Sequence, residues 1–150
     1  MLPVSLRLAG KNVLVVGAGR VAERRIETLL NEDAAVRVVA PEAGSRVQEL
    51  VSSGQVELSR RGFEEADLDG AWLVFAHTSS PELNSAIAEI CRQRRIWCLI
   101  GGDAHASDLW MMAHRQVDAD LTVAVSAHGN PRRAKRVVEQ LVTEARKGVQ

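Results

Sequence analysis

The sequence predicts an α/β fold with a doubly wound parallel sheet, and three observations support this prediction. Short runs of β-forming residues alternate with segments whose apolar residues recur at helical spacing, which is typical of βαβ units and a parallel sheet. The first run, Asn12–Val16, ends abruptly at two closely spaced glycines, Gly17 and Gly19, and a helical pattern begins at Arg20. After His105 the alternation changes, which indicates a separate and smaller segment, an appendage to the α/β core.

The same patterns place each element. Strands are expected at residues 12–16, 35–40, 56–59, 72–76 and 96–100, and helices at 20–30, 43–52 and 63–67. A further helix begins at Pro81, a residue suited to the first helical position, with Ser80 as its N-cap. Its helical spacing predicts a buried stripe of Leu83, Ala86, Ile87, Ile90 and Cys91. Beyond the sheet we expect a small strand–turn–strand–helix extension, with the turn at 118–120, the second strand at 121–126 and the helix at 131–147.

The glycine turn is the strongest functional signal. Gly17, Gly19 and Ala22 form a G-x-G-x-x-A pattern between a strand and a helix, the context that a dinucleotide-binding turn requires. Gly17 allows the tight turn, Gly19 lets a pyrophosphate approach the backbone, and Ala22 lets the helix pack close to the strand. The helix N-terminus offers N–H groups and a positive dipole end to the phosphates. The alternative is a tight turn whose glycines serve steric needs only.

An acidic residue for the cofactor ribose follows the second strand. Rossmann units carry one about 20 positions after the glycines. Here Glu42 stands behind Pro41, so either its carboxylate or the local backbone could bind the ribose. Alternatively, Glu42 merely opens the next helix, where a carboxylate suits the dipole. No Lys or Arg lies immediately at this strand end, which favours NAD over NADP, but Arg46 is near enough to leave the choice open.

Ligands on parallel sheets bind beyond the carboxyl ends of the strands, which here comprise residues 17–21, 40–42, 77–80 and 101–105. Asp103 lies on this edge, after Gly101 and Gly102. A carboxylate in that position can act as a general base. The alternative is that Asp103 is an Asx-turn residue of a glycine-rich loop.

The final helix carries an unusual charge pattern. Arg132, Arg133, Lys135 and Arg136 crowd its first half, where the helix dipole disfavours cations. An anionic ligand rich in carboxylates would compensate for this arrangement. The alternative is a solvated basic face, balanced by acidic residues further along the helix.

Composition limits the remaining possibilities. The 150 residues carry a formal net charge of zero, which argues against a general nucleic-acid partner. Cys91 and Cys98 stand in apolar segments and are expected to be buried free thiols. The histidines show no H-x-x-x-H spacing, so no metal site is predicted. Neither a signal peptide nor a membrane span is recognised, so we expect a cytoplasmic protein without a membrane partner.

The chain resembles the precorrin-2 dehydrogenase and sirohydrochlorin ferrochelatase family, which includes the N-terminal module of siroheme synthases. The resemblance covers nearly the whole sequence. The matching segments are residues 14–25 (LVVGAGRVAERR), 38–42 (VVAPE), 72–84 (WLVFAHTSSPELN), 96–103 (IWCLIGGD) and 120–131 (DLTVAVSAHGNP). The residues that follow the second glycine, Val21–Arg24, are far more specific than the glycines themselves.

The resemblance implies an enzyme of siroheme biosynthesis that oxidises precorrin-2 to sirohydrochlorin with NAD⁺. Some members also insert ferrous iron. The implied cofactor contacts are Gly17, Gly19, Arg20, Val21, Ala22, Pro41, Glu42 and Thr78. The essential aspartate of the family corresponds to Asp103, and the carboxylates of the tetrapyrrole would meet the basic helix and Ser126. Residues 1–108 would form the NAD-binding domain, and residues 109–150 would form the contact of a homodimer.

Departures from the family pattern gather on the substrate side. The proline two residues after the aspartate is replaced by His105, and the segment Trp110–Ala113 lacks its proline. The turn Ser126–Gly129 has lost one hydroxyl and one glycine, and the chain ends before the C-terminal helical domain of most members. The main alternative is therefore a non-catalytic homologue that binds NAD(H) or a tetrapyrrole. A Rossmann dehydrogenase for a small substrate is a weaker alternative.

Overall fold

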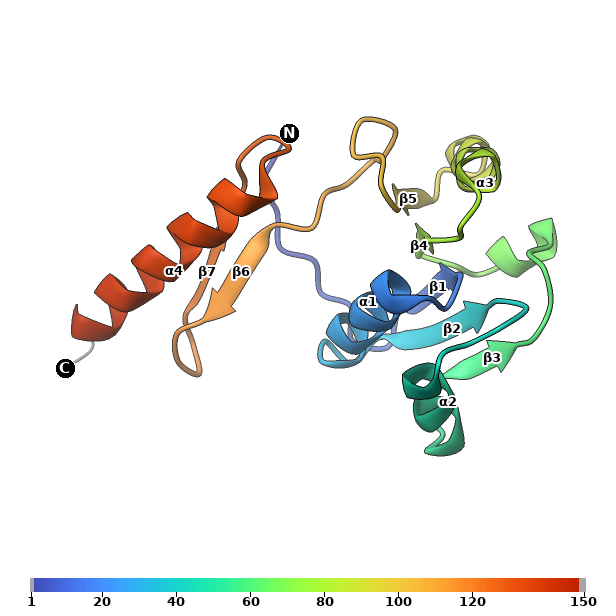
Figure 1. The fold of residues 1–150 in the computed structure, drawn as a ribbon, viewed down its shortest axis with the longest axis horizontal. Helices are drawn as coiled ribbons and strands as arrows, with labels where there is room; N and C mark the ends of the chain where they lie inside the picture. The colour runs from blue at the N-terminus through green and yellow to red at the C-terminus, as the bar shows by residue number, and fades with distance from the viewer. Residues whose placement is uncertain (1, 149–150) are drawn as a thin grey trace. The chain divides into compact units, whose positions relative to one another are not determined.

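The computed structural model describes residues 2–148, which divide between Leu109 and Trp110 into two compact units. The first unit holds a parallel sheet of five strands in the order β3–β2–β1–β4–β5 (Figure 1). Its strands are β1 (Asn12–Val16), β2 (Ala35–Val39), β3 (Glu57–Ser59), β4 (Leu73–Ala76) and β5 (Trp97–Ile100). Its helices are α1 (Arg20–Leu30), α2 (Ser45–Ser52) and α3 (Pro81–Gln93), with a short 3₁₀ helix, η1 (Glu65–Leu68). This arrangement confirms the predicted Rossmann-like α/β fold.

The two faces of the sheet are covered by different helices. Leu14, Val74 and Cys98 are in register across β1, β4 and β5, so they share one face. They belong to a buried cluster with Ile87 and Cys91 of α3. The alternate strand residues point to the opposite face, where α1 packs on β1 and β2. Because both faces are buried, the strands read as continuous apolar runs in the sequence.

The buried stripe of α3 differs in part from the predicted one. The residues that α3 buries are Asn84, Ile87, Ala88 and Cys91. Leu83 and Ala86, which were predicted to be buried, are exposed. The physical reason is Asn84, whose side chain satisfies polar groups of the loop before the helix and so occupies a core-facing position in the first turn. Cys91 and Cys98 are buried free thiols, as predicted.

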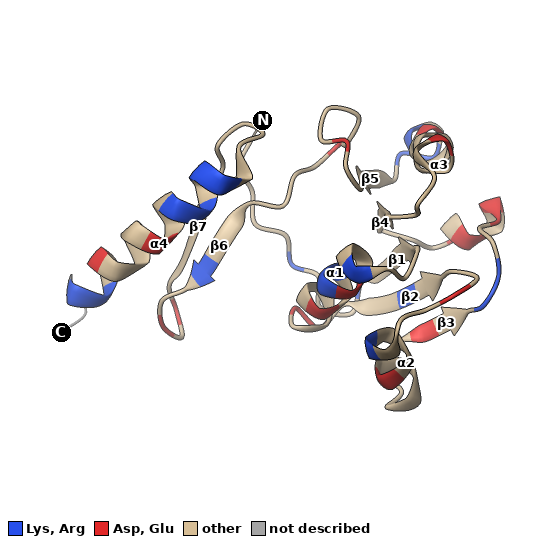
Figure 2. Cartoon of the chain, in the orientation of Figure 1, with Lys and Arg blue, Asp and Glu red and all other residues tan. Residues whose placement is uncertain are grey.

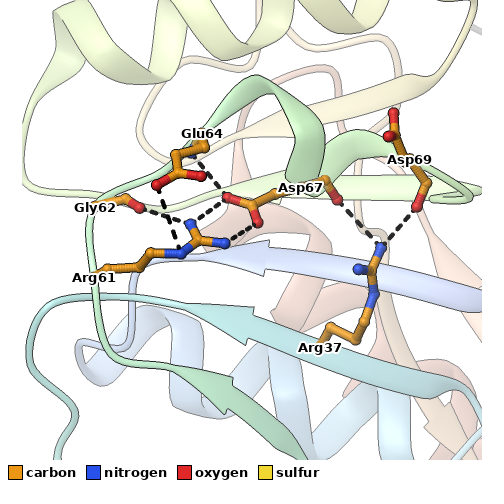
Figure 3. Close-up of polar contacts among 6 residues, drawn as sticks. All are labelled: Arg37, Arg61, Gly62, Glu64, Asp67 and Asp69. Carbon is orange, nitrogen blue, oxygen red and sulfur yellow. Dashed lines mark hydrogen bonds and ion pairs between the residues drawn. The ribbon is translucent and has the colours of Figure 1, made fainter.

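A polar cluster fixes the crossover between β3 and β4 (Figure 3). Arg61 donates two hydrogen bonds to the carboxylate of Asp67, of 2.8 and 2.6 Å, and the backbone N–H of Glu64 donates a third of 2.8 Å. Arg37 of β2 donates to the carbonyl oxygens of Asp67 and Asp69, at 3.2 and 3.1 Å. The hydrogen bond from Arg61 lowers the pKa of Asp67, although the side chain is buried. The cluster therefore ties η1 and the residue that follows it to β2.

The second unit is a two-stranded antiparallel sheet covered by one helix. Its elements are β6 (Ala113–Gln116), β7 (Thr122–Val125) and α4 (Pro131–Gly148). The carboxylate of Asp118 accepts hydrogen bonds from the N–H groups of Asp120 and Leu121, which forms the predicted turn. The buried residues Ala134 and Val138 lie on α4, which packs on both strands. None of the helices between residues 2 and 148 has the length and apolar character that crossing a bilayer requires.

Candidate functional site

The carboxyl ends of four neighbouring strands meet at one edge of the first unit. β2, β1, β4 and β5 end side by side. The N–H groups of Gly17, His77 and Gly101 each donate a 2.8 Å hydrogen bond to the last residue of the neighbouring strand. This edge therefore brings together the loops at 17–21, 40–42, 77–80 and 101–105, the segments in which the sequence placed the cofactor residues and Asp103. Ligands of parallel α/β sheets bind at this edge.

The two glycines of the first loop have different structural roles. Gly17 has φ +102°, and a Cβ there would overlap the carbonyl oxygen of His77, so only glycine fits. Gly19 is the N-cap of α1, in an extended conformation, and a Cβ there would meet nothing within 4 Å. No side chain among the described residues caps α1, so its first N–H groups have no side-chain partner at the helix start. A diphosphate could therefore approach the backbone at Gly19, where the helix dipole favours anions.

The first three residues of α1 differ in burial. The side chain of Ala22 is buried, so only its backbone could meet a ligand, and its small size lets α1 pack close to β1. Arg20 and Val21 are exposed at the helix start. Arg20 can therefore offer a guanidinium to phosphate oxygens from the same turn.

The loop after β2 leaves its acidic residue outside any helix. Pro41 and Glu42 are exposed, and α2 begins only at Ser45, with Gly44 as its N-cap. The structure therefore contradicts the alternative that Glu42 opens the next helix. Glu42 follows the end of β2, and two residues later the N–H of Gly44 donates to the carbonyl of Ala18 in the glycine turn at 3.4 Å. An exposed carboxylate at this edge could accept a hydrogen bond from a ribose hydroxyl.

A buried asparagine, which the sequence analysis missed, holds the loop after β4. Asn84 accepts hydrogen bonds from the N–H and the hydroxyl of Thr78, at 3.0 and 2.8 Å, and its own amide donates to the Thr78 carbonyl at 3.2 Å. Ser80 caps α3 through a 3.1 Å hydrogen bond from the N–H of Leu83, as predicted. A polar residue in the first turn of an otherwise apolar stripe was the available signal. Thr78 is thus fixed in place before any ligand binds.

His77 is a second residue of the edge to which the sequence analysis gave no role. Its ring stacks on Phe75 with 5.9 Å between ring centroids, and a Cβ at Gly101 would overlap its Nδ1. Its Nε2 and the Nε of Arg25 on α1 are buried and have no hydrogen-bond partner among the described residues. Burial, together with the charge of Arg25, lowers the pKa of His77 to about 4, so the imidazole is neutral at pH 7.

Asp103 lies in the exposed loop that follows β5. Its Oδ1 accepts 3.0 Å hydrogen bonds from the N–H groups of His105 and Ala106, the bonding of an Asx turn. Ser107 closes the same loop by donating a 2.7 Å hydrogen bond to the carbonyl of Asp103. The two sequence interpretations of Asp103 are therefore compatible, because the carboxylate shapes its own loop and remains exposed at the ligand edge.

The predicted substrate-binding residues all belong to the second unit. Arg132, Arg133, Lys135 and Arg136 are exposed on the first half of α4, and Figure 2 shows basic residues gathered there. The side chain of Asn130 accepts a 2.9 Å hydrogen bond from the N–H of Arg133 and so caps the N-terminus of α4. Ser126 is exposed just after β7. The four basic residues therefore give the first half of α4 an exposed cationic surface, whereas Ala134 and Val138 of the same helix are buried.

We also searched residues 2–148 for side chains that could bind a metal ion together. Among residues 2–148, no group of three His, Cys, Asp or Glu side chains is placed to hold an ion.

Comparison with known proteins identifies the first unit. A family described as "Putative NAD(P)-binding" matches residues 4–113, which includes the glycine turn, Glu42, Thr78 and Asp103. The chain belongs to this family. This match agrees with two features of the structure, namely the glycine turn after β1 and the N-terminus of α1, which no side chain caps.

Two similar proteins carry more specific names. Siroheme synthase 3 of Aeromonas hydrophila subsp. hydrophila is 37% identical over 129 residues, which are 85% of this chain and 27% of that protein. The siroheme synthase of Pseudomonas fluorescens (strain SBW25) is 41% identical over 93 residues, 62% of this chain and 20% of that protein. The chain thus spans about a quarter of the length of these relatives or less.

A solved structure extends the similarity to both units. The protein named SirC, precorrin-2 dehydrogenase, matches 96% of this chain and 71% of its own, with a TM-score of 0.80 and 28% sequence identity. These similarities confirm the resemblance inferred from the sequence segments.

Proposed function

We propose that this chain is an NAD-dependent dehydrogenase that oxidises precorrin-2 to sirohydrochlorin in siroheme biosynthesis. The observation that carries the proposal is the match to SirC, precorrin-2 dehydrogenase, over 96% of the chain with a TM-score of 0.80. The siroheme synthase relatives support the same pathway. The open glycine turn supplies the physical requirement, a backbone site for a diphosphate.

The residues of the carboxyl edge fit a dinucleotide. The uncapped N-terminus of α1 and the open space at Gly19 suit the diphosphate, with Arg20, Val21 and Ala22 contributing backbone N–H groups. Pro41 and Glu42 suit the adenosine ribose, since an exposed carboxylate accepts hydrogen bonds from hydroxyls. Thr78, held by Asn84, presents a fixed loop on the other side of the glycine turn. When bound, the nicotinamide ring supplies a hydride acceptor.

Asp103 is the proposed general base. Oxidation of precorrin-2 removes a hydride and a proton, and the cofactor takes only the hydride. An exposed carboxylate at the ligand edge can take the proton. The bonds that Oδ1 accepts from His105 and Ala106 orient the carboxylate. The role of this chain is therefore to position two reactants and to receive one proton.

The second unit is the proposed substrate and dimer segment. Precorrin-2 carries many carboxylates, and the cationic surface of Arg132, Arg133, Lys135 and Arg136, with Ser126, has the complementary charge. We also propose that residues 109–150 form the interface between the two subunits of a homodimer. The proposed location of the protein is the cytoplasm.

Incubation of the purified protein with NAD⁺ and enzymatically generated precorrin-2 tests the proposal. We expect NADH and the absorbance of sirohydrochlorin to appear in equal amounts. The Asp103→Asn variant keeps the oxygen that accepts the two loop hydrogen bonds, so it should fold normally and bind NADH as the wild type does. Its turnover should fall by about 10²-fold or more, the usual contribution of a general base.

A non-catalytic homologue is the second candidate, and the Asx-turn bonding of Asp103 favours it, because that bonding is a sufficient structural role for the carboxylate. NADH binding without any formation of sirohydrochlorin would support this candidate and would contradict the dehydrogenase proposal.

A further inference from the structure

We infer that a hollow around Trp72 and Trp97, at the amino edge of the sheet, binds an acidic segment of a protein partner through one apolar side chain. The parallel strands β1, β4 and β5 begin side by side at this edge, so it lies opposite the carboxyl edge. Trp72 directly precedes β4, where its N–H donates a 2.8 Å hydrogen bond to the carbonyl of Asn12, and Trp97 is the first residue of β5. This surface is separate from the proposed cofactor site, so its role does not depend on the proposed function.

Two half-exposed indoles line the hollow. Trp72 is 52% exposed and Trp97 is 50% exposed, which makes them the largest exposed apolar side chains among the described residues. Ala71, Arg95 and Ile96 complete the lining, and the space between the five residues measures about 230 Å³. Pockets that enclose whole small ligands usually measure about 300–1,000 Å³. The smaller space here suits a single apolar side chain, which is the usual anchor of a protein–protein contact.

Two cations without ion pairs flank the indoles. The Nζ of Lys11, the residue before β1, lies 4.7 Å from the centroid of the Trp72 ring. Arg95 lines the hollow itself. Neither Lys11 nor Arg95 forms an ion pair with a carboxylate of the described residues. Tryptophan and arginine are the residues most enriched where binding energy concentrates. The uncompensated positive charge therefore favours a partner with carboxylates on both sides of its apolar anchor.

Arg95 has a backbone conformation that glycine would adopt more easily. It follows Arg94, the C-cap of α3, and has φ +59°. Its N–H donates to the carbonyl of Arg92 at 3.1 Å, and the N–H of Ile96 donates to the carbonyl of Cys91 at 2.9 Å, the helix ending in which glycine is usual. A side chain in the left-handed region carries a conformational cost that glycine avoids. Arg95→Gly therefore removes the guanidinium without straining the fold, so a loss of binding in this variant reports the side chain.

Selection of random peptides displayed on phage against the full chain tests the inference. We expect the enriched peptides to carry one large apolar residue flanked by Asp or Glu. Calorimetric titration of a synthetic enriched peptide then compares the variants. Trp97→Ala should weaken binding by at least about tenfold, the loss expected when a central aromatic anchor is truncated. Arg95→Gly should weaken binding by about threefold at low salt and by less at high salt, because an exposed ion pair is weak and screened.

Two matched controls separate the hollow from other cationic surfaces. Arg92→Ala removes a cation of the same helix end that pairs with Glu89, and it should leave peptide binding unchanged. The double variant Arg132→Ala and Arg133→Ala removes charge from α4 and should also bind the peptide as the wild type does. Thermal unfolding of each variant shows that the fold is intact.

Four results would overturn the inference. They are enrichment of no peptide or of basic peptides, binding that survives both Trp97→Ala and Arg95→Gly, binding that is lost in the α4 double variant, and tighter binding of indole-3-acetate than of the peptide. The last result would assign the hollow to a small aromatic acid. Each of them would leave the proposed dinucleotide site standing, because that site lies at the other edge of the sheet.

Discussion

The side chain of Asn84 clamps Thr78 by accepting from its N–H and its hydroxyl and by donating to its carbonyl. The clamp links the first turn of α3 to the loop after β4, one of the loops of the ligand edge. These hydrogen bonds hold the loop at residues 77–80 in one conformation before any ligand binds.

Replacement of Asn84 by Ala should loosen this loop. The N–H of Thr78 would lose its partner in a partly buried place, which costs about 1–3 kcal/mol of unfolding free energy. NADH should also bind more weakly, because the loop must then be ordered on binding. Urea unfolding and NADH titration measure the two effects. Ser85→Ala truncates an exposed side chain of the same helical turn and serves as the control, with stability and NADH binding near those of the wild type. Wild-type stability in the alanine variant would show that the clamp contributes nothing.

The two glycines of the first turn should respond differently to the same substitution. Gly17→Ala places a Cβ against the His77 carbonyl at φ +102°, so it should lower the free energy of unfolding by about 1–3 kcal/mol. Gly19→Ala meets open space and should change it by less than about 0.5 kcal/mol. Gly19→Ala should nevertheless weaken NADH binding strongly, because the methyl group occupies the approach of the diphosphate. Normal NADH binding by Gly19→Ala would argue against this path of approach.

The neutral His77 should make stability depend on pH. Its folded-state pKa is about 4, below the value of about 6.5 in an unfolded chain. As the pH falls, the imidazole is protonated in the unfolded state before it is protonated in the folded state. The contribution of His77 to the free energy of unfolding is therefore complete above about pH 6.5 and declines by about 1 kcal/mol per pH unit as the pH falls towards 4. Urea unfolding at pH 7 and pH 5 measures the decline, and His77→Gln should remove this part of it. An imidazole that titrates near 6.5 by NMR would contradict the prediction.

The Asp67 cluster should produce a second pH effect at lower values. Asp67 has a lowered pKa because Arg61 donates to it, so its contribution is complete above the unfolded pKa of about 3.9 and is lost as the pH falls through the folded value. Asp67→Asn removes the charge and should cost about 1–3 kcal/mol at pH 7. The difference in unfolding free energy between the variant and the wild type should shrink at pH 3. A difference that is equal at both pH values would exclude this ionic origin.

The sequence predicted the framework of the first unit because its signals are local. The run at Asn12–Val16, the glycines behind it and Pro81 after Ser80 each determine conformation within a few residues, and the structure has β1, α1 and α3 where these signals place them. Periodicity cannot show which loops at the carboxyl edge of the sheet would contact the cofactor. That expectation came from the family motifs.

The remaining features depend on contacts between distant segments. Asn84 is buried because it satisfies Thr78. Its helical spacing from Ile87 and Cys91 places it on the buried stripe, but spacing alone does not show which polar groups it satisfies. The lowered pKa of His77 depends on its burial, to which the close approach of Gly101 after β5 contributes, and on the charge of Arg25 on α1. α2 begins only at Ser45, and the N–H of its N-cap Gly44 donates to the carbonyl of Ala18, a contact between segments that local signals around Glu42 do not reveal.

Backbone NMR during titration with NAD⁺ tests the central claim most directly, because it locates the cofactor on the chain. We predict that the amide signals of Gly19, Val21, Glu42 and Thr78 shift together and saturate at one dissociation constant. Signals at the opposite edge of the sheet, such as those of Trp72 and Trp97, should stay in place. Shifts confined to that opposite edge or to α4, with the amide of Gly19 unmoved, would contradict the account.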